Sequence, residues 1–207
     1  AKIAGLKLCE NYGSYYKLNY KTLMPCNAYG ENDNYDLNSS HFLPALVKKI
    51  IEAIRKKKNH ITLWGNGKAL RELIFSEDIA LACKYFLEKK TKSKIFNIGT
   101  GLEYSIEQYA KLIMKHLNVS LKITYDKTKP NGTHRKLLDS SLAQRNGWKH
   151  KTSFEKGISI VINDYLKNHL RKDTYWISCL AEVIDKNRSP ERSKTRGATV
   201  IDALLSK

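Results

Sequence analysis

The sequence has few cysteines and no long hydrophobic run, which argues against several kinds of protein. Its four cysteines lack the paired spacing of a zinc site or a secreted disulfide framework: Cys9, Cys26, Cys83 and Cys179. We therefore predict free thiols in a reducing compartment and no metal site. No apolar segment reaches the roughly 20 residues that span a bilayer, and the first residues lack the order of a signal peptide. Together these absences predict a cytoplasmic protein with no membrane partner.

A glycine-rich phosphate-binding turn is also missing from the sequence. A dinucleotide-binding fold begins with a strand, a G-x-G-x-x-G turn and a helix. The nearest strings, Gly65-x-Gly67 and Gly99-x-Gly101, lack the third glycine. We therefore do not expect either turn to hold a pyrophosphate group.

The chain carries a large excess of positive charge. Its 37 lysine and arginine residues outnumber its 20 acidic residues, which gives a formal net charge of +17. Clustered cations would indicate a nucleic-acid partner, because they neutralise phosphates. Here the lysines are scattered, and the one true run, 55–58, stands where a helix is expected to end and where cations suit the helix dipole. We therefore predict no nucleic-acid partner, and a basic nucleic-acid-binding module remains an alternative of a different class.

Strand and helix patterns alternate along the chain. Apolar residues at helical spacing predict helices over residues 4–15, 43–54, 106–117 and 154–165, with a further helix starting at 76–78. Short alternating or apolar runs predict strands over 20–24, 60–64, 70–75, 94–98 and 121–125. Irregular polar stretches are expected over 25–38 and 127–132. The alternation predicts an α/β fold with parallel strands joined by helices.

Turn and cap residues refine these predictions. The turn Gly65-Asn66-Gly67 between two strands predicts a β-hairpin. Helix starts are predicted at Ser39–Ser40, at 76–78, at a capping box of Ser105 and Gln108, and at Thr152 with Glu155.

Five segments of the chain together form a recognisable pattern: residues 1–10, 24–34, 38–46, 64–72 and 129–139. In their order and spacing they resemble the GDP-L-fucose synthase family of extended short-chain dehydrogenases/reductases. The resemblance covers roughly residues 1–170 and matches the carboxy-terminal part of the family's domain, including its substrate-binding subdomain. It implies an incomplete Rossmann-like doubly wound sheet, of which only the later strands are present, with a smaller α/β substrate-binding domain. Residues 171–207 resemble nothing in the family. We expect them to form an unassigned tail that is partly disordered, because residues 186–197 are charged and polar.

The resemblance also implies an activity. Enzymes of this family epimerise GDP-4-keto-6-deoxy-D-mannose at C3 and C5 and reduce the C4 ketone with NADPH, which yields GDP-L-fucose. The implied cofactor is NADP(H), the implied partner is a GDP-sugar substrate, and the implied assembly of the full-length protein is a homodimer. Because the glycine-rich turn and the catalytic tyrosine belong upstream, we expect residues 1–207 alone to be inactive.

Two catalytic residues follow from the resemblance. Lys2 matches the lysine of a Tyr-x-x-x-Lys motif, which lowers the pKa of the tyrosine and holds the nicotinamide ribose. His41 matches a histidine that exchanges protons during epimerisation and lies against the cofactor, a task that suits an imidazole titrating near neutrality. The cofactor's nicotinamide side is expected to contact a loop of four residues: Pro25, Cys26, Asn27 and Ala28.

The predicted substrate-binding residues are Lys49, Trp64, Arg71, Asn131 and Lys136. Arginine can direct two donors to a phosphate, lysine supplies a point charge, and tryptophan offers an apolar surface beside a nucleotide base. We expect these residues and His41 to line one concave surface. Lys49 stands where the family usually has arginine and Asn131 where it usually has aspartate, so the preference for guanine stays open.

Other functions remain compatible with these residues. A dehydratase or 4-epimerase of the same superfamily, acting on another nucleotide sugar, is the nearest alternative. The string around His41 and the segment 129–133 favour the fucose synthase type. An inert fragment is the remaining alternative.

Overall fold

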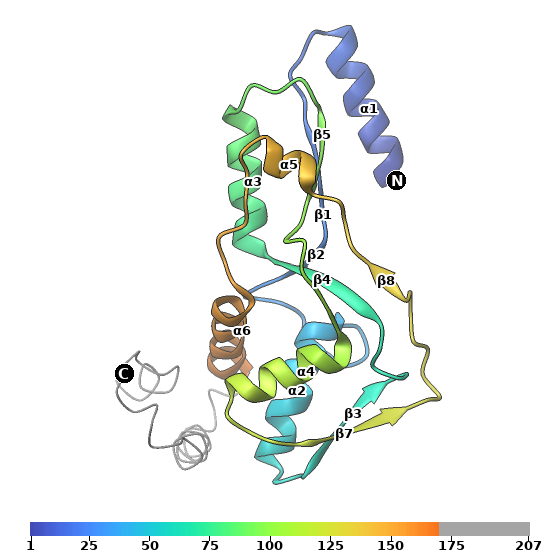
Figure 1. The fold of residues 1–207 in the computed structure, drawn as a ribbon, viewed down its shortest axis with the longest axis vertical. Helices are drawn as coiled ribbons and strands as arrows, with labels where there is room; N and C mark the ends of the chain where they lie inside the picture. The colour runs from blue at the N-terminus through green and yellow to red at the C-terminus, as the bar shows by residue number, and fades with distance from the viewer. Residues whose placement is uncertain (170–207) are drawn as a thin grey trace, which may run out of the picture. The chain divides into compact units, whose positions relative to one another are not determined.

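A computed structural model describes residues 1–169 of the chain (Figure 1). These residues form two compact units, each described here separately. The first unit comprises residues 1–28, 71–103 and 135–152, and the second comprises 29–70, 104–134 and the described residues from 153 onward. The predictions for residues 171–207 lie outside the described residues.

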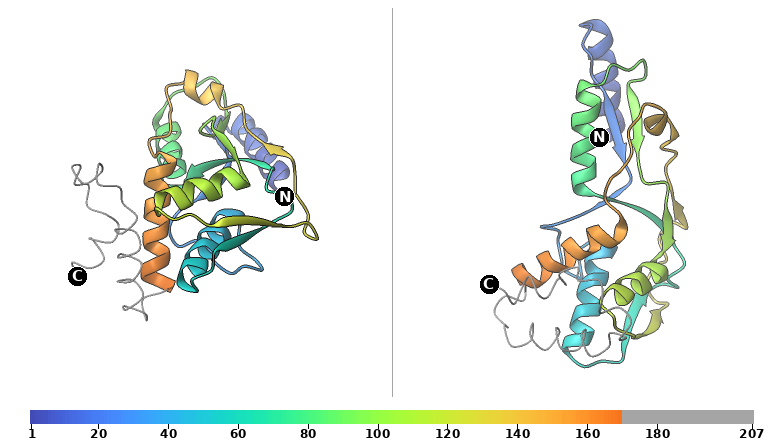
Figure 2. Two further views of the ribbon diagram at one scale, coloured as in Figure 1. Left: turned by 60° about the horizontal axis from the view of Figure 1, so that its bottom comes forward. Right: turned by 60° about the vertical axis from the view of Figure 1, so that its left-hand side comes forward.

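The first unit contains a pair of parallel strands, as the alternating sequence pattern predicts. Strand β1 (Thr22–Pro25) pairs in parallel with β5 (Ile95–Ile98), with Thr22 opposite Ile95 and Pro25 opposite Ile98. The two views of Figure 2 show helix α3 (Ser76–Glu88) running along these strands. Helix α1 (Lys2–Tyr15) and the short helix α5 (Ser141–Arg145) complete the unit.

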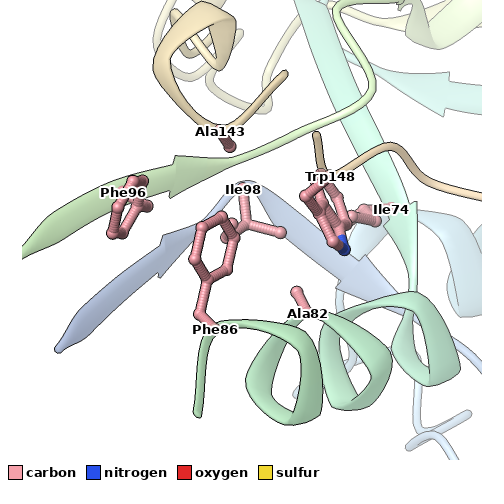
Figure 3. Close-up of a cluster of buried hydrophobic side chains, with 7 residues drawn as sticks. All are labelled: Ile74, Ala82, Phe86, Phe96, Ile98, Ala143 and Trp148. Atoms are coloured by element: carbon pink, nitrogen blue, oxygen red, sulfur yellow. The ribbon is translucent and has the colours of Figure 1, made fainter. Parts of the chain in front are cut away.

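The core of the first unit lies between α3 and the strand pair. Phe86 from α3 stacks on Phe96 from β5, with ring centroids 4.2 Å apart. The buried cluster is drawn in Figure 3 and consists of Ile74, Ala82, Phe86, Phe96, Ile98, Ala143 and Trp148. Each buried isoleucine or phenylalanine in this cluster stabilises the fold by about 1.5–3 kcal/mol, so the cluster fixes the helix against the strands.

A second sheet has the strand order β2-β4-β6, with β8 paired to β4. The strands are β2 (Asn27–Tyr29), β4 (Leu70–Phe75), β6 (Glu103–Ser105) and β8 (Arg135–Lys136). The sequence predicts β4 correctly but misses the other three strands, because two or three residues are too few to show an alternating pattern. The expectation of an irregular stretch over 25–38 is therefore wrong at β2.

The second unit is built on three helices and another parallel pair. Helix α2 (Phe42–Arg55) turns its apolar residues inward, including Val47 and Ile50, and packs on α4 (Ile106–His116) and on β3 (His60–Trp64). Helix α6 (Phe154–His169) also packs on α4. Strand β3 pairs in parallel with β7 (Lys122–Asp126), with His60 opposite Lys122. Tyr109 of α4 is buried in the core.

The predicted hairpin between 60–64 and 70–75 is wrong. Strand β3 pairs with β7, whereas β4 joins a different sheet. The burial of the strands explains the difference: β3 alternates, with Ile61 and Leu63 inward, whereas β4 is buried continuously from Glu72 to Phe75. Gly65 and Gly67 adopt φ values of +66° and +69°, so the turn exists, but it passes the chain from one sheet to another.

One of the four predicted helix caps is confirmed. Ser105 and Gln108 form a complete capping box at the start of α4. At α2 the cap position is His41 rather than the preceding serines, and at α3 Phe75 precedes the helix without a side-chain cap. At α6 the side chain of Ser153, not Thr152, accepts a bond from the Lys156 amide. Only the complete capping box, with both partners at the expected spacing, therefore predicted a cap correctly.

Within residues 1–169, no helix is both long and apolar enough to cross a membrane. The same residues hold no group of three potential metal-binding side chains.

Candidate functional site

Trp64 lies at the centre of a cluster of an aromatic ring and two lysines in the second unit. Its side chain stands on the solvent side of β3, and the residue is 50% exposed. The ammonium nitrogens of Lys49 and Lys129 each lie 5.3 Å from the centroid of its ring. This distance is within the range of cation–π attraction, so α2 and the loop after β7 both hold a cation beside the exposed indole.

Lys49 is fixed in place by the strand beneath it. Its ammonium group donates to the main-chain oxygen of Thr62 at 3.0 Å. Burial lowers the pKa of Lys49, while the nearby carboxylate of Asp126 opposes this shift. Asp126 stands opposite Trp64 in the β3–β7 register, and hydrogen bonds from Thr128 lower the pKa of its carboxyl group.

Asn131 has a structural bond that the sequence did not predict. Its side-chain oxygen accepts a hydrogen bond from the main-chain nitrogen of Asn66 at 2.7 Å. A Cβ atom at Gly65 would lie 2.3 Å from the same oxygen, so glycine is needed there. The amide oxygen of Asn131 is thus engaged with the turn that follows Trp64.

His41 is exposed at the first position before α2, where its backbone is extended and its side chain makes no capping bond. An exposed imidazole at a helix start can exchange protons with a bound molecule. The proton-transfer role of His41 remains a prediction.

In the first unit, paired strands carry Arg71 and Lys136. Arg71 lies on β4 and is half-buried, and Lys136 lies on β8 and is exposed. Arg135, the neighbour of Lys136, is held by Glu103, with 2.6 Å between the closest guanidinium nitrogen and carboxylate oxygen. Because Arg135 is paired with Glu103, Lys136 is the cation of β8 that is suited to bind an anion.

Glu72, which the sequence did not single out, is a buried residue that holds two separate segments by hydrogen bonds. It is fully buried next to Arg71 on β4. Its two carboxylate oxygens accept hydrogen bonds from the main-chain nitrogens of Gly101, at 2.7 Å, and Leu138, at 3.0 Å. The only sequence signal was its place in the segment 64–72, where Arg71 drew attention to phosphate binding.

The predicted cofactor loop follows strand β1 of the parallel pair. Cys26 donates its main-chain N–H to Ile98 at 2.9 Å, and Asn27 donates its side-chain amide to the main-chain oxygen of Glu72 at 2.9 Å. Burial raises the pKa of the Cys26 thiol to about 12, with the charge of Glu72 adding to the shift. The thiol is therefore protonated and unreactive at neutral pH.

These residues fit a dinucleotide in part. The carboxyl ends of parallel strands are where α/β folds bind nucleotides, and residues 25–28 lie at such an end. Lys2 is exposed in the first turn of α1. The sequence holds no glycine-rich turn for a pyrophosphate group, so the fit is confined to the nicotinamide side.

The predicted site residues therefore fall into two groups. Lys49, Trp64 and Asn131 come together in the second unit, joined by Lys129, which the sequence analysis did not select. Arg71 and Lys136 lie on the paired strands β4 and β8. A single concave surface made from both groups stays a prediction.

Comparisons with known proteins identify the chain's relatives. Residues 1–99 match the model of the NAD dependent epimerase/dehydratase family. The chain is 42% identical to GDP-L-colitose synthase of Yersinia pseudotuberculosis over 161 residues, which cover 77% of this chain and 52% of that protein. It is 39% identical to the GDP-L-fucose synthase of Sinorhizobium fredii over 168 residues, 81% of this chain and 54% of that protein.

The chain is similar in sequence to several GDP-L-fucose synthases. It spans about half the length of the curated relatives that it matches.

Solved structures agree with this relationship. A GDP-mannoheptose C4 reductase from Campylobacter jejuni with NADP bound matches with a TM-score of 0.68 at 29% identity, covering 79% of this chain and 58% of that one. A GDP-L-fucose synthetase from Naegleria fowleri matches with a TM-score of 0.70 at 22% identity, covering 79% and 52%. The α/β fold with parallel strands is therefore confirmed.

Proposed function

We propose that this chain forms the nucleotide-sugar-binding part of an NADP(H)-dependent epimerase/reductase that converts GDP-4-keto-6-deoxy-D-mannose to GDP-L-fucose. The observation that carries the proposal is the exposed ring of Trp64 with two ammonium groups 5.3 Å from its centroid. A nucleoside diphosphate combines a flat aromatic base with two anionic phosphates. An aromatic ring beside fixed cations is complementary to both features.

Each predicted substrate residue has a role in this proposal. Trp64 stacks on the base, and Lys49 and Lys129 neutralise phosphate charge. Arg71 directs two donors to a phosphate, and Lys136 adds a point charge. Asn131 holds the turn behind Trp64 and offers its NH₂ group to the base.

The cofactor role rests on fewer residues. When bound, NADPH supplies the hydride that reduces the C4 ketone. Residues 25–28 would line its nicotinamide side, and Lys2 would hold the ribose. His41 would remove and return protons at the carbons beside the ketone, which the ketone acidifies.

A second candidate is a reaction of the GDP-L-colitose synthase type. The 42% identity to the Yersinia pseudotuberculosis protein favours it. Both candidates share a GDP-sugar substrate, so the group around Trp64 serves either one. A cytoplasmic location and a homodimeric assembly remain predictions from the sequence.

Binding of GDP tests the nucleotide site directly. Isothermal titration of the chain with GDP should give saturable binding, and Trp64→Ala or Lys49→Gln should weaken it about tenfold. Lys48→Gln is the matched control, because Lys48 is the adjacent lysine on α2 and makes no cation–π contact with Trp64 among the described residues. Equal affinity in all variants would refute the proposed site.

The same titration distinguishes the proposed nucleotide site from the alternative of a nucleic-acid-binding module. A basic module should bind an arbitrary single-stranded DNA with an affinity that falls steeply with salt, and should show no preference for GDP. The reaction itself is tested by supplying GDP-4-keto-6-deoxy-D-mannose and NADPH to the full-length protein. Appearance of GDP-L-fucose supports the proposal, whereas a protein that binds GDP but does not convert this ketosugar would count against it and in favour of the second candidate.

A further inference from the structure

Glu72 joins separate segments of the first unit. It is 0% exposed and lies on β4 between Arg71 and the buried end of the strand. One carboxylate oxygen accepts the Gly101 N–H at 2.7 Å, in the turn after β5. The other accepts the Leu138 N–H at 3.0 Å, two residues after Lys136.

A third segment reaches the same residue through its backbone. The Asn27 side-chain amide donates to the main-chain oxygen of Glu72 at 2.9 Å. The turn after β5 also approaches very closely, since a Cβ atom at Gly99 would lie 2.4 Å from the Glu72 carboxylate. No cation forms a salt bridge with Glu72 among the described residues, so backbone N–H groups satisfy its oxygens.

We propose that Glu72 is a positioning residue for ligand binding by the first unit. Its carboxylate fixes the segment that carries Lys136 beside the strand that carries Arg71, and its backbone orients Asn27 in the predicted cofactor loop. Glu72 touches no ligand itself. This inference rests on the proposed function, because it assigns Glu72 to the nucleotide-sugar site.

The chemistry requires a carboxylate with two acceptor oxygens. Glutamine has nearly the same shape but replaces one oxygen with an NH₂ group. That group would face the N–H of Gly101 or of Leu138, and two donors cannot bond to each other. One buried N–H would then lose its partner, and the segment that it holds would shift.

Asp78 provides a matched control in the same unit. It is 1% exposed, and its carboxylate oxygens accept the main-chain N–H groups of Lys151 and Thr152 at 2.9 and 3.0 Å. Asp78→Asn therefore makes the same chemical change, with the same number of bonds disturbed. It acts on a segment that carries no predicted ligand residue.

The test is titration of the full chain and its variants with GDP. Glu72→Gln should raise the Kd for GDP about tenfold, whereas Asp78→Asn should leave it within about twofold while both variants lose similar thermal stability. In NMR spectra, the side-chain amide signal of Asn27 should move in Glu72→Gln and stay in place in Asp78→Asn. Glu72→Asp, whose shorter side chain keeps the charge but cannot reach both N–H groups, replaces Glu72→Gln if that variant does not fold.

The outcomes distinguish the inference from the proposed function. If the unchanged chain does not bind GDP, the proposed function fails, and the inference fails with it. If the unchanged chain binds GDP and Glu72→Gln binds equally well, only the positioning role of Glu72 is overturned. An equal loss of affinity in Asp78→Asn would also overturn it, because the effect would then be one of general stability.

Discussion

At the scale of single residues, Asn131 combines a predicted binding role with an observed structural one. Its side-chain oxygen accepts the Asn66 N–H, and such a bond contributes about 1 kcal/mol. We expect Asn131→Ala to lower the free energy of unfolding by about this amount in urea denaturation. Asn131→Asp keeps the acceptor and should stay within about 0.5 kcal/mol of the unchanged protein. An equal loss in both variants would show that the bond to Asn66 is not the cause.

A second prediction concerns the cysteines. Burial raises the pKa of Cys26 from its ordinary value of 9.0 to about 12, whereas Cys9 and Cys83 are exposed. At pH 8, iodoacetamide should label Cys9 and Cys83 at least about tenfold faster than Cys26, because the thiolate is the reactive form. Mass spectrometry of the separated peptides measures each rate. Comparable labelling of Cys26 would contradict the burial of its thiol.

The same pKa shift has a consequence for stability, with a defined sign. Between pH 9.0 and about 12 the folded thiol keeps its proton while the unfolded thiol loses it. The contribution of the protonated Cys26 thiol to the free energy of unfolding is therefore fully present below pH 9.0 and is lost as the pH rises through this window. Cys26→Ala should make the decline of stability in this window less steep, as followed by urea denaturation at several pH values.

Single residues also show what the sequence can predict of a site. Trp64 and Lys49 could be selected because an aromatic residue and a cation suit a nucleotide. Glu72 could not, because a carboxylate next to an arginine that is predicted to bind phosphate suggests no ligand. Its role depends on the approach of Gly101 and Leu138, which are distant in sequence.

At the scale of elements, the helix starts provide a controlled comparison. Ser105 caps α4 with a complete capping box, whereas Ser76 at the start of α3 makes no capping bond. Ser105→Ala should therefore lower the free energy of unfolding by about 1 kcal/mol. Ser76→Ala should change it by less than about 0.5 kcal/mol. Thermal unfolding of both variants measures the difference, and similar losses would refute the assignment of the caps.

Two glycines within helices lead to opposite predictions. Alanine at Gly5 in α1 would meet nothing within 4 Å, whereas a Cβ atom at Gly157 in α6 would lie 2.2 Å from the hydroxyl oxygen of Tyr29. Gly5→Ala should stabilise the protein by about 0.5–1 kcal/mol, because glycine is a poor helix former. Gly157→Ala should destabilise it by about 1–3 kcal/mol through overpacking. Stabilisation by both changes, in urea denaturation, would contradict the packing of Tyr29 on α6.

Elements also differ in how well the sequence predicts them. The helices α2 and α4 were predicted because their apolar residues repeat at helical spacing over several turns. The pairing of β3 was not, because a glycine turn between two strands looks the same whether it closes a hairpin or leads to another sheet. The partner of β3 is β7, and only long-range packing selects it.

At the scale of the whole molecule, α1 predicts self-association. None of its residues is buried, and its apolar side chains include Ile3 at 80%, Leu8 at 58% and Tyr15 at 81% exposure. We expect the chain to form dimers or larger species in analytical ultracentrifugation as its concentration rises. Ile3→Glu combined with Leu8→Glu should shift it toward monomer.

A control for this prediction lies on α3. Leu87 is also 81% exposed, so Leu87→Glu makes the same change outside α1 and should leave the association unchanged. A monomer at all concentrations, or the same effect from Leu87→Glu, would contradict a role of α1 in assembly.

The parallel pairing of β1 with β5 also affects when the first unit can fold during synthesis of the chain. Thr22 has its strand partner at Ile95, so β1 leaves the ribosome long before β5 is synthesised. At roughly 5–20 residues per second, the delay amounts to several seconds. During that time the backbone groups of Thr22 to Pro25 lack the strand with which they pair in the fold. The first unit therefore cannot complete its parallel strand pair during early synthesis, because β1 must wait until β5 has been made.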